Sequence, residues 1–119
     1  MQDINEILVL VDQYIIKLIN AIENAVKAFK QQKEDEGLKL LIQIIDGLSW
    51  VIETMVNLMP VLQEHRLDAD PEKINVLLRE LLGAMENEDF VLISDLLEYE
   101  VLEILSSWKS VIEKATVKN

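Results

Sequence analysis

Residues 4–30 carry apolar side chains at alternating intervals of four and three, and this spacing is the strongest constraint on the fold. The apolar positions are 4, 8, 11, 15, 18, 22, 25 and 29. The alternation is typical of an amphipathic helix that packs against other helices along a seam. The opposite row, at positions 6, 13, 17, 20, 24, 27 and 31, is polar. We therefore predict a long helix at the start of the chain.

A second helix is predicted over residues 38–62, which repeat the seam after a polar break at 31–37 that ends in Gly37. A further apolar row lies about 100° away around the helix axis. It consists of Leu40, Ile44, Val51 and Leu58. Such a helix meets water along one narrow side only. Pro60 lacks a backbone donor, so we expect the helix to kink or end near it.

Residues 65–70 form the clearest linker, and a third helix is predicted directly after them. Asp70 has the side chain of an N-cap, and Pro71 suits the first helical position. The apolar positions of this helix are 74, 77, 78, 81, 82 and 85. Gly83 lies within it, where we expect it to permit the close approach of another helix.

A tight turn is predicted at residues 86–89, before the last helix. Asn87 is expected to take the left-handed conformation that ends a helix, and Asp89 to cap the helix that follows. The predicted seam of the last helix is Phe90, Ile93, Leu97, Val101, Ile104, Trp108 and Val111. Residues 115–119 are expected to fray.

These four segments predict an all-α fold, namely an antiparallel up-down four-helix bundle made of two helical hairpins. We expect one domain over residues 1–119. The first hairpin covers about 3–64, the linker 65–70, and the second hairpin about 71–116. Only two prolines and three glycines interrupt the chain, which favours long helices.

Composition makes several classes of function improbable. The net charge of −11 repels phosphate backbones and anionic lipids, so we expect no nucleic-acid or membrane partner. The chain has no cysteine, which fits a reducing cytoplasm. The longest interval without a charge runs from Glu53 to Glu64 and contains Pro60, so no transmembrane helix is predicted. The acidic N-terminus is unlike a secretory signal.

The sequence also lacks an assembly of catalytic groups. Its single histidine, His65, lies in the linker, far from the Glu-x-x-His pattern of di-iron bundles. Asp95 and Glu98 are three residues apart but share the polar row of the last helix, so we interpret them as solvent-facing. No serine has a histidine partner or an oxyanion hole nearby. We therefore predict no enzyme activity, no cofactor and no metal.

Surplus apolar residues are the best indication of function. The second and last predicted helices carry more apolar rows than one seam uses, so either these helices are central in the bundle or the surplus forms an interface. Trp50 lies on a polar row, where it could anchor a partner or lie under the linker. The candidate partner-binding residues are Leu40, Ile44, Trp50, Val51, Leu92, Leu96 and Tyr99. The partner would be the helix of a client protein or a second copy in a homodimer.

The acidic run at 86–103 has two interpretations. It can provide solubility and compensate the helix dipole through Glu88 and Asp89. Alternatively, it can attract a basic segment of a partner, an effect that salt would weaken.

Two segments resemble a known family. Residues 8–48, "LVLVDQYIIKLINAIENAVKAFKQQKEDEGLKLLIQIIDGL", are similar to the first hairpin of flagellin-specific export chaperones, and residues 81–108 are similar to their last hairpin. The resemblance implies a bacterial cytoplasmic bundle that masks an aggregation-prone helical segment of a secreted subunit. The family's tyrosine-rich N-terminal segment is absent here. Residues 84–101 also resemble uncharacterised small helical proteins of Gram-positive anaerobes.

Overall fold

The computed structural model describes residues 3–116, which form four rods of helix and no strand. The molecule is elongated, with principal extents of 47 × 24 × 23 Å. The elements are α1 (Ile4–Lys30), α2 (Glu34–Glu64), α3 (Glu72–Glu86), α4 (Phe90–Asp95), η1 (Leu96–Val101) and α5 (Leu102–Ala115). The elements α4, η1 and α5 are continuous and together form one rod, residues 90–115, which we call the last helix.

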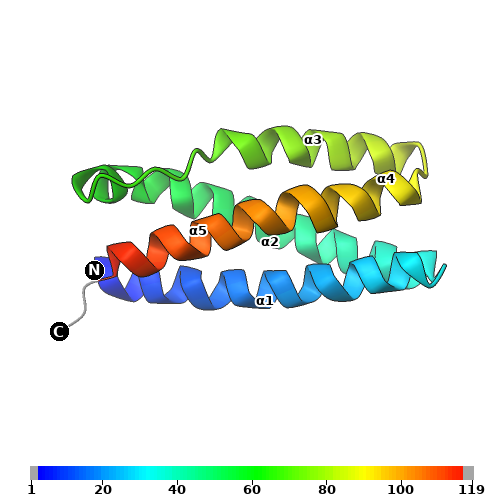
Figure 1. Cartoon of the computed structure of the whole chain (residues 1–119), viewed down its shortest axis with the longest axis horizontal. Helices are drawn as coiled ribbons and strands as arrows, with labels where there is room; N and C mark the ends of the chain where they lie inside the picture. The colour runs from blue at the N-terminus through cyan, green and yellow to red at the C-terminus, as the bar shows by residue number, and fades with distance from the viewer. Residues whose placement is uncertain (1–2, 117–119) are drawn as a thin grey trace.

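The rods run up, down, up and down, as predicted for two antiparallel hairpins (Figure 1). Both hairpin turns lie at one end of the bundle, and the segment that joins the hairpins lies at the other. The last helix runs obliquely: α4 packs against both α3 and α1, whereas α5 packs mainly against α1. The predicted all-α bundle is therefore confirmed.

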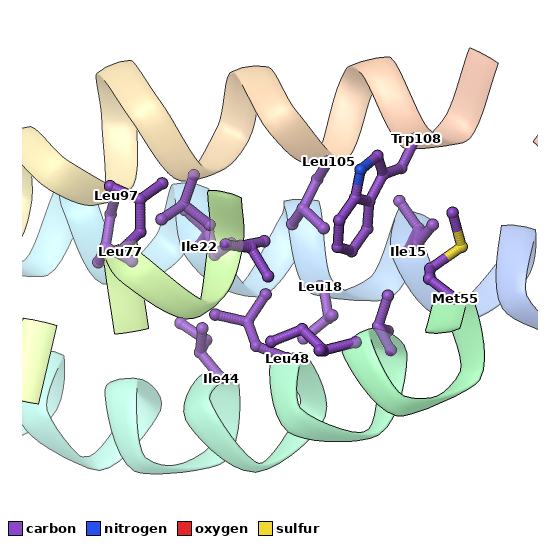
Figure 2. Packing of buried hydrophobic residues seen from close by; sticks show 14 of the residues in the cluster. Ile15, Leu18, Ile22, Ile44, Leu48, Met55, Leu77, Leu97, Leu105 and Trp108 are labelled. Carbon is purple, nitrogen blue, oxygen red and sulfur yellow. The ribbon is translucent and has the colours of Figure 1, made fainter. Parts of the chain in front are cut away.

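The core follows the predicted seam of the first helix closely. Every seam position of α1 from Leu8 to Phe29 is buried, and only Ile4 at its start is exposed. Figure 2 shows Ile15, Leu18 and Ile22 of α1 lying between the apolar side chains of the other rods. Since α1 packs against both α2 and the last helix, it is the central contact of the bundle.

Three helices end in the same way, and the sequence does not mark any of these ends with glycine. Gln32, Arg66 and Glu88 have positive φ angles of 61°, 59° and 52°. In each case the next N–H bonds back to a carbonyl five residues earlier, as Asp89 does to Ala84 at 2.9 Å. This is the Schellman arrangement, which satisfies the last carbonyls of a helix. Non-glycine residues accept the left-handed conformation here because the surrounding hydrogen bonds hold it.

The predicted details of the hairpin turns are partly wrong. Glu88 rather than Asn87 is left-handed, because Asn87 is still within the helix end with φ −90°. The capping role of Asp89 is confirmed: its carboxylate accepts a hydrogen bond from the N–H of Leu92 at 3.1 Å. At the first hairpin turn, α2 begins at Glu34, four residues before the predicted start. Three acidic residues occupy the first helical turn of α2, where they interact favourably with the positive end of the helix dipole.

The joint between the hairpins also differs from the prediction. The helix α2 continues through Pro60 to Glu64. Asp70 is left-handed, with φ 45°, and its side chain does not cap α3. Its own N–H instead donates to the carboxylate of Asp68 at 3.0 Å. Pro71 therefore lies just before α3 rather than in its first turn. Of the segment predicted to fray, Ala115 is helical, and 117–119 lie outside the described residues.

A π-helical turn, η1, changes the register of the last helix. The buried row is Ile93, Leu97, Val101, Leu105, Trp108 and Ile112. Three successive intervals of four would rotate this row by about 120° in a regular α-helix. The wider i→i+5 turn of η1 accommodates one extra residue and turns the row back by about 100°. The predicted seam is therefore wrong at Ile104 and Val111, which are only half-buried, whereas Trp108 is buried as predicted.

By length and composition alone, α2 could cross a bilayer. The spacing of its charges, in contrast, predicts no transmembrane helix. Its most apolar window has a mean hydropathy of 1.3, and 39% of that window is buried in the bundle. The core helix of a soluble bundle has the same length and composition, and α2 supplies ten buried residues to this core.

The glycines of α2 and α3 generate a first prediction. A Cβ on Gly83 would meet no atom within 4 Å, contrary to the expected close approach, whereas one on Gly37 would lie 2.7 Å from the Phe29 ring. Gly83→Ala should raise the free energy of unfolding by about 0.5–1 kcal/mol through helix propensity. Gly37→Ala should lower it by about 1 kcal/mol, because overpacking outweighs that gain. Urea unfolding would measure both, and a gain in stability for both variants would show that the Phe29 ring moves aside at little cost.

A second prediction concerns the π-helical turn. Deleting the exposed Tyr99 shortens the interval between Leu97 and Val101 to three, which restores alternating intervals of four and three along the buried row. We expect the deletion variant to form the same bundle with a regular last helix, and to lose less than about 1 kcal/mol in urea unfolding.

The matched control deletes Asn20, an exposed residue in the middle of α1. This deletion rotates half of a regular seam by about 100° out of the core, and we expect it to abolish cooperative unfolding. Equal losses from the two deletions would show that η1 does not correct the register.

Candidate functional site: an acidic groove

Three of the predicted partner-binding residues are not available to a partner. Ile44, Val51 and Leu96 are exposed by only 1%, 0% and 3% and belong to the core cluster. The prediction that their rows form an exposed surface is therefore wrong. The other possibility, that these helices are central in the bundle, holds instead. Each of them faces two neighbouring helices and therefore buries more than one apolar row.

The other four candidates lie at the surface but do not share one groove. Leu40 is half-buried, whereas Trp50, Leu92 and Tyr99 are exposed. Leu40 and Trp50 border two separate hollows on the α1 side of α2. Leu92 and Tyr99 belong to the last helix. The structure does not bring these four residues together.

The linker lies against Trp108 rather than against Trp50. Trp50 packs on Tyr14 of α1, with ring centroids 4.9 Å apart and 59° between the ring planes. It is Trp108 that contacts the linker: its indole N–H donates to the carbonyl of Ala69 at 2.5 Å. Trp108 is otherwise buried at 1% exposure, as predicted, and its ring reaches into the core from α5 (Figure 2).

A groove of about 640 Å³ opens between α3, the linker and the last helix. We call it the acidic groove. Its apolar floor consists of Ala69, Val76, Leu77, Ile104 and Trp108. Its polar rim consists of Asp68, Asp70, Lys73, Glu80, Glu100, Glu103 and Ser107. The rim thus carries five carboxylates against one lysine.

The course of the last helix explains why the groove exists. This helix contacts α3 through α4 and η1, but α5 diverges from α3 while it stays packed on α1 (Figure 1). The start of α3 therefore has no helix packed tightly against it on that side. The linker closes one end of the groove, where Ala69 is held by Trp108. The hydrogen bond from the Asp70 N–H also fixes the Asp68 carboxylate at this end.

The two sides of the last helix differ in how their charges are paired. On the α1 side, Lys30 donates to Glu98 at 2.6 Å, and Lys109 binds Glu113 and lies 3.8 Å from Asp12. The hydrogen bond lowers the pKa of Glu98 and raises the pKa of Lys30. On the groove side, within residues 3–116, no ion pair joins Glu80, Glu100 or Glu103 to a cation.

The two carboxylates considered as metal ligands point to different surroundings. Asp95 is exposed, as predicted, but Glu98 is half-buried and paired with Lys30. Within the described part of the chain, no group of three or more His, Asp or Glu side chains is placed to hold a metal ion.

Only part of the acidic groove could be recognised in the sequence. The acidic run at 86–103 includes Glu100 and Glu103, and its second interpretation was a landing site for a basic segment. The other half of the rim, from Asp68 to Glu80, was assigned to a linker and a helix start. Another missed feature is on α2, where Ile42 and Val56 are 56% and 51% exposed.

The fold and groove define a small all-α bundle with an open surface site rather than an enclosed cavity. The chain matches the family described as Domain of unknown function (DUF8042) over residues 6–111, and it belongs to that family. No curated protein and no solved structure matches the chain.

Proposed function

We propose that this protein is a non-enzymatic, cytoplasmic helical-bundle protein that binds a helical segment of a partner protein in the acidic groove. The observation that carries the proposal is the groove itself, in which an apolar floor lies between two helices. Val76 on this floor is 45% exposed. Apolar side chains between two helices are the usual receptor for the apolar face of a third.

The length of the groove fits a short contact. Its α3 wall runs over residues 73–80, and its other wall runs over residues 100–108 of the last helix. At 1.5 Å per residue these walls are about 10–12 Å long, which corresponds to roughly two turns of a bound helix.

A finer form of the proposal rests on the resemblance of both hairpins to flagellin-specific export chaperones. In that form the partner is an aggregation-prone helical segment of a secreted subunit, and the protein masks it in the cytoplasm. The residues that support this form are the hairpin patterns at 8–48 and 81–108.

A second candidate function is a structural homodimer, which the exposed aliphatic row on α2 favours. Ile42 and Val56 are exposed, and Ile45 and Met59 of the same row are half-buried. With a net charge of −11, two copies repel each other, and this repulsion is smallest where the contact surface is uncharged. A two-fold contact through this row would satisfy that condition.

Replacing Val76 by Asn tests the groove. This change removes part of the apolar floor without altering charge, and we expect it to weaken partner binding about fivefold, from ~1 kcal/mol of lost burial. Affinity capture from the native cell, with quantitative mass spectrometry, measures the partners retained by each variant. Val91→Asn is the matched control, because Val91 is a 73% exposed valine of α4 outside the acidic groove. Equal retention by both variants would refute the proposal.

Light scattering at micromolar concentration tests the second candidate. A homodimer should dissociate when Ile42 and Val56 are both replaced by Asp, because each dimer would then bury like charges at its contact. A wild-type protein that scatters as a strict monomer would rule the homodimer out.

A further inference from the structure

We infer that the partner segment is a cationic amphipathic helix, with its apolar face on the floor of the acidic groove and its Lys or Arg side chains on the rim. This inference rests on the proposed function and specifies the chemistry of the partner.

Charge complementarity favours a cationic partner. Five rim carboxylates face one lysine, Lys73, and all five acidic residues are exposed. Like charges gathered along one groove repel each other, and low dielectric walls increase the local potential. A bound cation relieves this repulsion, whereas an anionic segment or a nucleic acid increases it.

On the opposite side of the last helix, a neighbouring helix forms ion pairs with charged residues of the last helix. Where α1 covers the last helix, Lys30 is placed beside Glu98 and Asp12 lies beside Lys109. Glu98 and Lys109 of the last helix are thus paired with residues of the helix that covers that side. On the groove side, where α5 has diverged from α3, Glu100 and Glu103 make no ion pair within residues 3–116. A partner helix with lysines would repeat on α3 and α5 the contact that α1 makes on the other side.

The shape of the groove favours a helix as its occupant. Val76 and Ile104 of the apolar floor come from two different helices, α3 and α5, and Trp108 and Ala69 lie at the linker end. A helix can place residues at i, i+3, i+4 and i+7 in such a channel. An extended peptide cannot bind here by adding a strand to a sheet, because the described chain contains no strand. The partner is therefore a helix with one apolar face and cations along both borders of that face.

The test uses three fluorescent peptides of about four turns, roughly 14 residues. All three carry Leu on one helical face; the flanking positions are Lys in the first, Gln in the second and Glu in the third. Fluorescence anisotropy measures the Kd of each for the full-length protein. We expect the Lys peptide to bind about tenfold more tightly than the Gln peptide, from about three exposed ion pairs. The Glu peptide should not bind, and added salt should abolish the preference for Lys.

A matched pair of protein variants locates the effect. The groove variant combines Glu80→Gln, Glu100→Gln and Glu103→Gln. The control combines Glu6→Gln, Asp46→Asn and Glu53→Gln, which are exposed acids outside the groove. Both variants change the net charge equally. We expect only the groove variant to lose the tenfold preference for the Lys peptide.

The outcomes separate this inference from the proposed function. Equal binding of the Lys and Gln peptides would overturn the cationic partner and leave helix binding in place. Absence of binding by all three peptides would overturn both. An equal loss in the two protein variants would show attraction to the overall charge of the molecule, and this would overturn the groove as the site.

Discussion

The last helix packs against two neighbouring helices, and the spacing of its apolar residues does not suit a regular α-helix. Its buried row advances by four residues three times in succession before Leu105. Without correction, the halves before and after η1 would turn different faces toward α1, which both halves contact. The π-helical turn η1 lets one continuous rod contact α1 along its whole length and α3 only near the hairpin turn. The oblique course of this rod determines the shape of the rest of the surface.

The acidic groove follows from that course. Since α5 leaves α3 to pack on α1, the start of α3 and the linker remain uncovered on one side. The helix therefore has a paired side, where Lys30 and Lys109 make ion pairs, and an unpaired side, where Glu100 and Glu103 face the groove. Surface ion pairs of this kind contribute little to stability. The difference between the two sides matters instead for which partners the protein attracts and how fast.

The sequence predicts the parts of this fold that depend on local periodicity. The seam of α1, the cap at Asp89 and the burial of Trp108 each follow from residue spacing or from one side chain and its neighbours. The helix ends at Gln32, Arg66 and Glu88 do not, because the left-handed residue there is held by surrounding hydrogen bonds rather than by its own preference. The groove is harder to predict because it depends on how two segments, residues 68–80 and 100–108, separate in space. Ile44 and its buried counterparts were misplaced for the same reason: periodicity shows that a helix has a wide apolar face, but only the packing shows which neighbour covers it.

The hydrogen bond between Trp108 and Ala69 has a consequence for the order of assembly. The joint between the hairpins is made in the middle of the chain, yet the side chain that secures it belongs to the final helix. A ribosome synthesises the linker well before Trp108. The first hairpin can pack α1 against α2 as it emerges, since their contacts are the most extensive in the molecule. The linker, and with it the closed end of the groove, can become fixed only after Trp108 has been synthesised.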